Sequence, residues 1–157
     1  MKVIFLDVDG VLNDDYTADR SPAGFIGIDD EMVANLERIV RKTGAKIVLS
    51  SSWRSSWCPD DPDSWDPDAK YLVGKLAKCN LVMIDKTPTH NNQRGAEIRM
   101  WLRDHPCVTH WVVLDDSTFP DFEPQNIIPH WVHTFNRCGG LTREKADRAI
   151  AILNGEV

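Results

Sequence analysis

The feature that most constrains the fold of this chain is an alternation, kept from end to end, of short apolar runs with segments of helical periodicity. The apolar runs cover residues 3–6, 47–49, 81–84, 111–114 and 131–135. They are too short for helices and are typical of buried strands. Repeated β-α-β units predict an α/β fold of the Rossmann-like, three-layer kind, with a mostly parallel five-stranded sheet between helices. No linker divides the sequence, so residues 1–157 are predicted to form a single domain.

The segments between the apolar runs carry the start and stop signals of helices. Asp29 is a predicted N-cap, because apolar residues follow it at helical spacing, and Gly44 suits the position just after the helix end. Thr142 is the predicted N-cap of the last helix, and Asn91 or Asn92 is that of an earlier one. These helices would form the outer layers of the fold.

Polar side chains follow three of the predicted strands at the point where each strand ends. They are Asp7 and Asp9 after the first strand, Ser50, Ser51 and Ser52 after the second, and Asp115 and Asp116 after the fourth. Ligands of open parallel sheets bind at the carboxyl ends of the strands. We therefore expect these side chains to share one site.

The acidic residues of this group predict a metal ion. Asp7 and Asp9 alone are equally consistent with an ordinary acidic turn, in which Gly10 allows a tight backbone path. A second acidic pair at the same edge changes this, because two unit charges about 4 Å apart repel by roughly 4 kcal/mol at an effective dielectric of 20. A hard divalent cation with oxygen ligands, such as Mg²⁺, relieves that repulsion.

The serines and Arg94 point to phosphate. A hydroxyl and the following backbone amide at a strand end can hold phosphate oxygens, although three serines also suit a polar turn. Arg94 lies in the first turn of a predicted helix, where a cation opposes the helix dipole. A solvent-exposed arginine is one interpretation. The other is that the guanidinium clamps phosphate oxygens and has no structural duty.

Four motifs in this order make the chain recognisable. They are "VIFLDVDGVLN", "KIVLSSSWR", "NNQRGAEI" and "WVVLDDS", and together they cover residues 3–117. The ordered set resembles the haloacid dehalogenase superfamily of phosphatases. Val11 stands where many members have Thr, and Arg94 stands where Lys is commoner. Neither departure removes a nucleophile or a charge.

The resemblance implies a role for each residue of the site. Asp7 would attack phosphorus and form an aspartyl-phosphate. Asp9 would protonate the leaving group and then activate water, while its backbone carbonyl helps to hold Mg²⁺. Arg94 would stabilise the charge of the intermediate. Asp116 would be a direct Mg²⁺ ligand, and Asp115 would orient waters or Arg94.

One serine of the cluster would bind the phosphoryl oxygen. The spacing in the superfamily slightly favours Ser51 for this role, and Ser50 remains the alternative. The resemblance thus implies a magnesium-dependent hydrolase of phosphoric monoesters.

Most members of the superfamily add a cap domain between the first and second or the second and third motifs. Here the first gap holds one helix and a loop over residues 13–28, and the second holds an acidic loop over residues 55–67, one helix and one strand. Neither gap has room for a domain, which implies a capless member. Capless relatives often act on large substrates, and the chain resembles most closely the polynucleotide-end phosphatase domains of nucleic-acid repair proteins.

The expected partner is a phosphorylated substrate, with nucleotides and nucleic-acid ends as candidates and small metabolites as the alternative. Trp53 and Trp57 would stack on bases or belong to the core, and the roles of Arg20 and Arg54 are left open. A catalytically silent module that binds a metal or a phosphorylated ligand is a further alternative. The sequence identifies neither the substrate nor the oligomeric state.

Composition excludes several classes of function. A net charge of −6 argues against a tight, non-specific nucleic-acid binder, which carries a basic stripe. No apolar run reaches the roughly 20 residues needed to cross a bilayer, and no signal-peptide cleavage site follows the first run. The four cysteines are scattered without a Cys-x-x-Cys pair, so a cytoplasmic location is expected. No obligate protein partner is indicated.

Two other interpretations of the sequence, a zinc site and a response-regulator receiver, are disfavoured. A zinc cluster of His130, His133 and Cys138 is disfavoured, because no second cysteine lies nearby. A response-regulator receiver has its phosphoacceptor after the third strand, whereas the second acidic pair of this chain follows the fourth.

Overall fold

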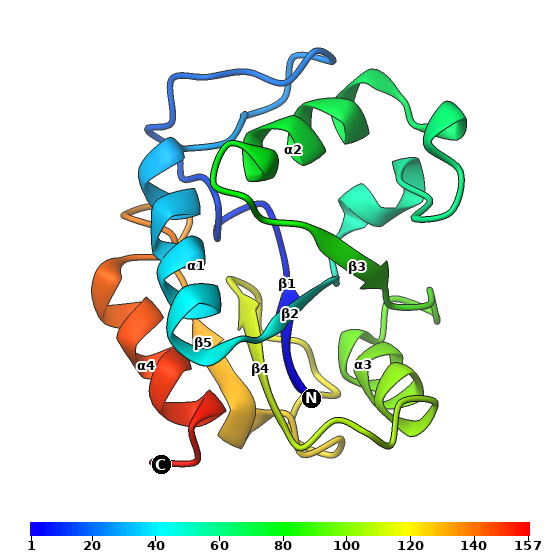
Figure 1. The fold of residues 1–157 in the computed structure, drawn as a ribbon, viewed down its shortest axis with the longest axis vertical. Coiled ribbons are helices and arrows are strands. Elements are labelled where there is room, and N and C mark those ends of the chain that lie inside the picture. The colour runs from blue at the N-terminus through cyan, green and yellow to red at the C-terminus, as the bar shows by residue number, and fades with distance from the viewer.

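A five-stranded sheet, parallel throughout, with strand order β3-β2-β1-β4-β5 forms the centre of the computed structural model, which describes residues 1–157 (Figure 1). The strands are β1 (Lys2–Leu6), β2 (Lys46–Leu49), β3 (Met83–Lys86), β4 (His110–Asp115) and β5 (Trp131–His133). This confirms the predicted Rossmann-like α/β fold without a cap domain. The order also excludes a receiver fold, whose strands run 2-1-3-4-5.

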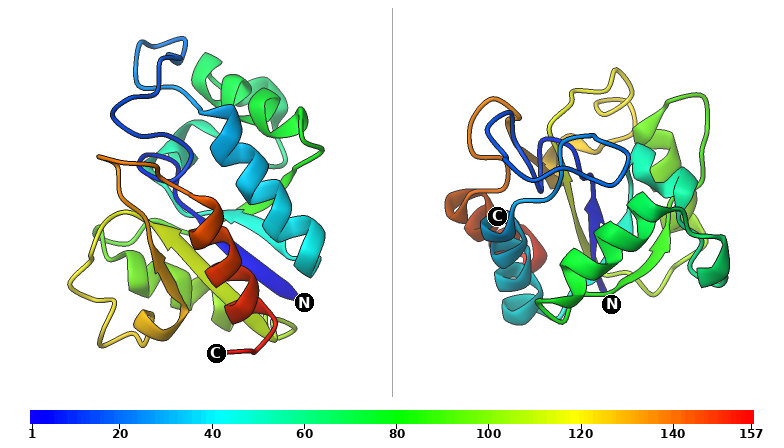
Figure 2. Two further views of the ribbon diagram at one scale, coloured as in Figure 1. Left: turned by 90° about the vertical axis from the view of Figure 1, so that its left-hand side faces the viewer. Right: turned by 90° about the horizontal axis from the view of Figure 1, so that it is seen from above.

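Helices cover both faces of the sheet. They are α1 (Asp30–Thr43), α2 (Pro67–Ala77), α3 (Arg94–Arg103) and α4 (Arg143–Leu153). Helices α1, α2 and α4 share the larger hydrophobic core, and α1 and α4 lie side by side (Figure 2). Helix α3 packs on the opposite face (Figure 1). None of the four is long and apolar enough to span a bilayer.

Strand β1 shows how the sequence sorts its side chains between the two faces. Ile4 and Leu6 belong to the larger core, whereas Val3 and Phe5 belong to the smaller core under α3. All four are fully buried. Because successive side chains of a strand point to opposite faces, an unbroken apolar run is what a strand covered on both faces requires.

Two of the predicted helix caps are confirmed. The Asp29 side chain accepts hydrogen bonds from the backbone N–H groups of Glu31 and Met32, and Gly44 ends α1 with a φ of 70°. The Thr142 side chain accepts from the backbone N–H of Lys145 at the start of α4. Both helices therefore begin where a side chain caps them, and α1 ends at a left-handed glycine.

The predicted cap of α3 is wrong. Neither Asn91 nor Asn92 caps the helix, which begins at Arg94 after Gln93, and no side chain caps it. Both asparagines have positive φ, 50° and 56°. Asparagine tolerates this left-handed conformation through its short polar side chain, so the pair forms a turn that leads the chain into α3.

The segment before β3 also differs from the prediction. The strand begins at Met83, two residues later than expected, because Leu81 is a core residue whose backbone N–H still bonds the end of α2 at Leu76. The acidic segment 55–67 begins within a 3₁₀ turn at Ser52–Ser56 and contains a second at Pro62–Ser64. Helix α2 begins at Pro67, capped by the Asp66 side chain.

Both ends of the chain lie at the amino ends of the strands (Figure 1). The Lys2 side chain at the start of β1 donates a hydrogen bond to the Asn154 side chain, with an N–O distance of 2.8 Å. The polar residues that follow β1, β2 and β4 therefore lie at the opposite edge of the sheet.

Candidate active site

Three carboxylates meet between the carboxyl ends of β1 and β4. Asp7 follows β1, Asp115 ends β4 and Asp116 follows it, and oxygen atoms of all three lie within 4.8 Å of one another. Strands β1 and β4 are neighbours at the point where the strand order reverses, which is where ligands bind in open α/β sheets. Asp7 and Asp115 are buried, at 8% and 1% exposure.

Arg94 is the cation that faces these acids. From the first residue of α3 its Nη1 lies 2.8 Å from Asp115 Oδ2 and 3.7 Å from Asp7 Oδ1. The same nitrogen donates to the backbone carbonyl of Ser50. Arg94 thus joins the ends of β1, β2 and β4. These contacts give it a structural role, which the interpretation of Arg94 as a phosphate clamp without structural duty did not include.

The electrostatics of the group favour a bound cation. Burial, with repulsion from Asp115, raises the pKa of Asp7 well above its ordinary value. Burial also raises the pKa of Asp115 to about 6, although Arg94 opposes the shift. When all three carboxylates are ionised, the single guanidinium leaves two negative charges unbalanced, and the atoms of the group that could bind a metal ion are all carboxylate oxygens. This donor set fits a hard divalent ion such as Mg²⁺.

Gly10 is required where the ends of β1 and β4 approach each other. Its φ is 78°, and a Cβ at this position would overlap the carboxylate of Asp116. The Thr134 hydroxyl, after β5, donates to the Gly10 carbonyl over 2.7 Å. The glycine therefore serves the close packing of Asp116 as well as the tight turn expected from the sequence.

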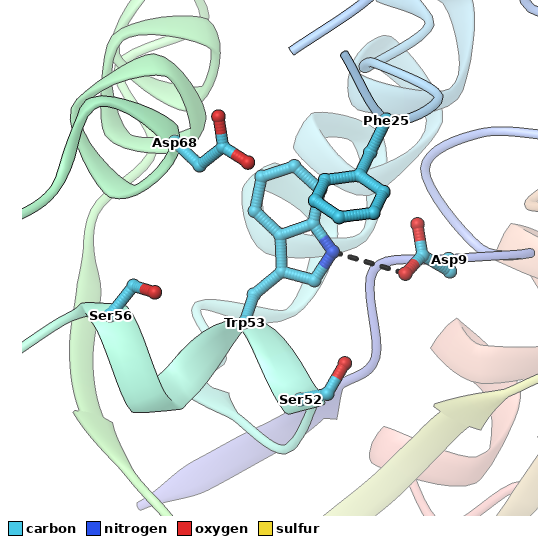
Figure 3. A pocket seen from close by; sticks show the side chains of 6 residues that line it. All are labelled: Asp9, Phe25, Ser52, Trp53, Ser56 and Asp68. Atoms are coloured by element: carbon cyan, nitrogen blue, oxygen red, sulfur yellow. Dashed lines mark hydrogen bonds between the residues drawn. The ribbon is translucent and has the colours of Figure 1, made fainter. Parts of the chain in front are cut away.

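Asp9 lies apart from the three carboxylates and is exposed. One carboxylate oxygen accepts from Asn13 Nδ2 at 3.0 Å. The other accepts from Trp53 Nε1 at 3.1 Å (Figure 3). The buried Asn13 also bonds the Gly10 backbone N–H and the Gly27 carbonyl. Asn13 thus orients Asp9, a role that the sequence reasoning missed.

The three serines have three different environments. Ser50 Oγ is buried and has no hydrogen-bond partner. Ser51 Oγ accepts from the backbone N–H of Trp53 and caps the 3₁₀ turn, and Ser52 is exposed. Ser50 is the one serine of the three with a buried hydroxyl that has no partner, whereas the motif spacing slightly favours Ser51.

The sequence reasoning also missed a buried ion pair next to Arg94, formed by Arg54 and Glu97. Glu97, on α3 and 1% exposed, accepts from Arg54 Nη2 at 2.9 Å and from the His90 backbone N–H at 2.8 Å. Its carboxylate also lies 3.9 Å from Arg94 Nε. Arg54 Nη1 is buried without a partner, and burial lowers the pKa of Arg54. The only sequence signal is a glutamate one helical turn after Arg94.

Other residues weighed from the sequence lie elsewhere. His130 and His133 stack on Trp111 and Trp131, with ring centroids 3.7 and 4.4 Å apart, and form no metal-ligand group with Cys138. Trp57 is a core residue at 4% exposure, so it cannot stack on a base. Arg20 donates to the backbone carbonyls of Thr17 and Asp19 within its own loop.

The geometry agrees with a family comparison. A family model described as "HAD domain in Swiss Army Knife RNA repair proteins" matches residues 3–146. The match runs from β1 into α4 and includes every residue of the candidate site. A comparison with curated proteins found no match.

Proposed function

Because the chain belongs to the family of HAD domains in Swiss Army Knife RNA repair proteins, we propose that it is a magnesium-dependent phosphomonoester hydrolase with an aspartyl-phosphate intermediate. One observation carries the proposal: Asp7, Asp115 and Asp116 converge where the strand order reverses, with Arg94 bridging two of them. A buried acidic group of this kind is suited to hold a cation and a phosphoryl group together.

The first half of the reaction belongs to Asp7 and Asp9. A carboxylate oxygen of Asp7 forms a bond to phosphorus while the bond from phosphorus to the leaving oxygen breaks. Asp9 donates its proton to the leaving oxygen. The hydrogen bonds from Asn13 and Trp53 hold both oxygens of Asp9 beside the site in the free protein.

The second half returns both side chains to their starting state. Asp9, now a carboxylate, removes a proton from a water molecule whose oxygen attacks phosphorus. The bond between phosphorus and the Asp7 oxygen breaks, and inorganic phosphate leaves. Asp7 is again a carboxylate and Asp9 is again protonated.

The remaining residues of the site would bind the charged phosphoryl group and the metal ion. Arg94, oriented by Asp115, and the free hydroxyl of Ser50 would hold oxygens of the phosphoryl group. Asp7, Asp116 and the backbone carbonyl of Asp9 would hold Mg²⁺, whose charge offsets that of the transferring group.

Magnesium is expected to stabilise the protein and to be required for turnover. A ligand that binds only the folded state raises the melting temperature, and here it would relieve the repulsion among three carboxylates. Thermal unfolding and hydrolysis of a generic aryl phosphate should be measured with Mg²⁺, with Ca²⁺ and with excess chelator. Ca²⁺ should stabilise the fold but support little turnover, because its coordination is looser. Full activity in excess chelator would contradict the proposal.

Arg94→Ala is expected to lower kcat/KM by about 100-fold or more, the usual effect of losing a preorganised charge donor. The metal-free protein should also lose stability, because Asp7 and Asp115 lose their shared cation. Arg94→Lys keeps the charge without the planar fork and should lose less activity. Arg103→Ala, an exposed arginine at the end of the same helix, is the matched control. Unchanged catalysis in Arg94→Ala would remove this residue from the mechanism.

A further inference from the structure

A small pocket opens beside Asp9, and none of the three carboxylates of Asp7, Asp115 and Asp116 lines it. Its volume is about 190 Å³, and it is lined by Asp9, Phe25, Ser52, Trp53, Ser56 and Asp68 (Figure 3). Pockets that enclose a whole drug-sized ligand measure roughly 300–1,000 Å³. This pocket therefore suits one ring system of a larger molecule that extends into solvent.

Two aromatic side chains from different parts of the chain form its walls. Trp53 packs partly against the larger core, and its indole N–H binds Asp9. Phe25 is 67% exposed. Flat aromatic walls bind planar rings by stacking, and base–aromatic stacking is tolerant of sequence.

The loop that carries Phe25 is attached to α2 by hydrogen bonds from Ser21 and Ala23. Arg20 and Ile26 form a β-bridge, so the loop that carries Phe25 turns back on itself. The Asp68 carboxylate, on α2, accepts from the Ser21 hydroxyl and from the Ala23 backbone N–H. The aromatic wall is thus part of a hydrogen-bonded turn. This turn and α2 lie together at the top of Figure 1.

The charges at the pocket limit what enters it. Asp9 and Asp68 both line it, and no cationic side chain does. A second phosphate in the pocket would meet two carboxylates, which disfavours diphosphates and sugar bisphosphates there. The hydroxyls of Ser52 and Ser56 suit the polar edge of a heterocycle. An uncharged planar ring with polar edges fits this lining.

We infer that the pocket between Phe25 and Trp53 binds the base of a nucleotide or of a nucleic-acid end whose phosphate is the one removed. The inference rests on the proposed function, because Asp9, the proton donor to the leaving oxygen, is hydrogen-bonded to the pocket wall. A leaving group whose oxygen Asp9 protonates would therefore lie next to a residue that lines this pocket. Phe25 and Trp53 become specificity-determining residues that distinguish nucleotides from small alkyl phosphates.

The test compares Phe25→Ala, Phe25→Tyr and the wild type on adenosine 5′-monophosphate, its 3′ isomer and glycerol phosphate. Loss of one stacking wall should lower kcat/KM for at least one adenosine phosphate by roughly 5-fold to 150-fold, mainly through KM. The effect on glycerol phosphate should be smaller, so the ratio of the two efficiencies falls. Phe25→Tyr should restore the ratio. Tyr16→Ala, which removes an exposed aromatic ring that lines a different pocket, is the matched control.

Calorimetric binding of the same adenosine phosphates to Asp7→Asn protein separates this inference from the proposed function. Weaker binding after the additional change Phe25→Ala supports the pocket even if no monoester is hydrolysed, in which case only the phosphatase proposal fails. Equal losses on adenosine and glycerol phosphates, or unchanged binding, would overturn the assignment of the pocket to a base.

Discussion

Asp7→Asn is expected to lower turnover of an aryl phosphate by at least about 10³-fold, the scale on which loss of a catalytic nucleophile acts. An amide of the same shape cannot form the acyl-phosphate bond, while the buried position after β1 stays filled. Acid quenching during turnover should trap one phosphoryl group on wild-type protein and none on the variant. Asp15→Asn, an exposed acid in the following loop, is the matched control.

The same variant has an expected effect on stability in chelator. Because the folded-state pKa of Asp7 is raised, the native protein binds more protons than the unfolded chain between the ordinary carboxyl pKa and the raised value. The free energy of unfolding of the metal-free protein therefore falls as pH rises from the ordinary carboxyl pKa to the raised value, and above it ionised Asp7 destabilises the fold by a constant amount. Asp7→Asn should be the more stable protein at neutral pH, and its advantage should shrink as pH falls.

For the turnover experiment, an Asp7→Asn rate within tenfold of the wild-type rate would show that Asp7 is not the nucleophile.

Glu97→Gln is expected to destabilise the fold by about 3–5 kcal/mol, the usual loss when one partner of a buried ion pair is removed. The substitution keeps the shape of the side chain but leaves the Arg54 guanidinium buried without its counter-charge. The midpoint of urea unfolding should fall with little change in slope. Glu37→Gln, which breaks a surface pair with Arg41 at 3.9 Å, should lose less than about 1 kcal/mol.

A double-mutant cycle tests whether the loss comes from the pair itself. Combining Glu97→Gln with Arg54→Met should destabilise the protein by less than the sum of the two single changes, because the second removes the uncompensated charge. Additive losses would show that Arg54 and Glu97 act independently. A Glu97→Gln protein as stable as Glu37→Gln would rule out a structural role for the pair.

Much of the fold could be predicted from the sequence, because its determinants are local. The run before Asp7 is apolar on both faces, and Asp29 and Thr142 cap their helices with their own side chains. The meeting of Asp7 with Asp115 followed from one general rule about the carboxyl ends of parallel strands. Local pattern and strand topology were sufficient for these features.

The features that escaped prediction depend on contacts between distant segments. Leu81 looked like the start of a strand, but it packs in the core before the strand begins. Asn13 looked like a loop residue, yet it bonds Asp9 and the carbonyl of Gly27. Arg54 and Glu97 are 43 residues apart and meet only once α3 lies against the end of β2. No periodicity or spacing carries such information.

The position of the two termini has a practical consequence. Met1 and the residues after α4 lie at the amino ends of the strands, bound to each other through Lys2 and Asn154, whereas Asp7 and Asp116 open at the other edge. The molecule can therefore be tethered to a surface, a reporter or a second domain through either terminus while the edge that carries the acids stays free. A bulky molecule can then approach that edge from the solvent side.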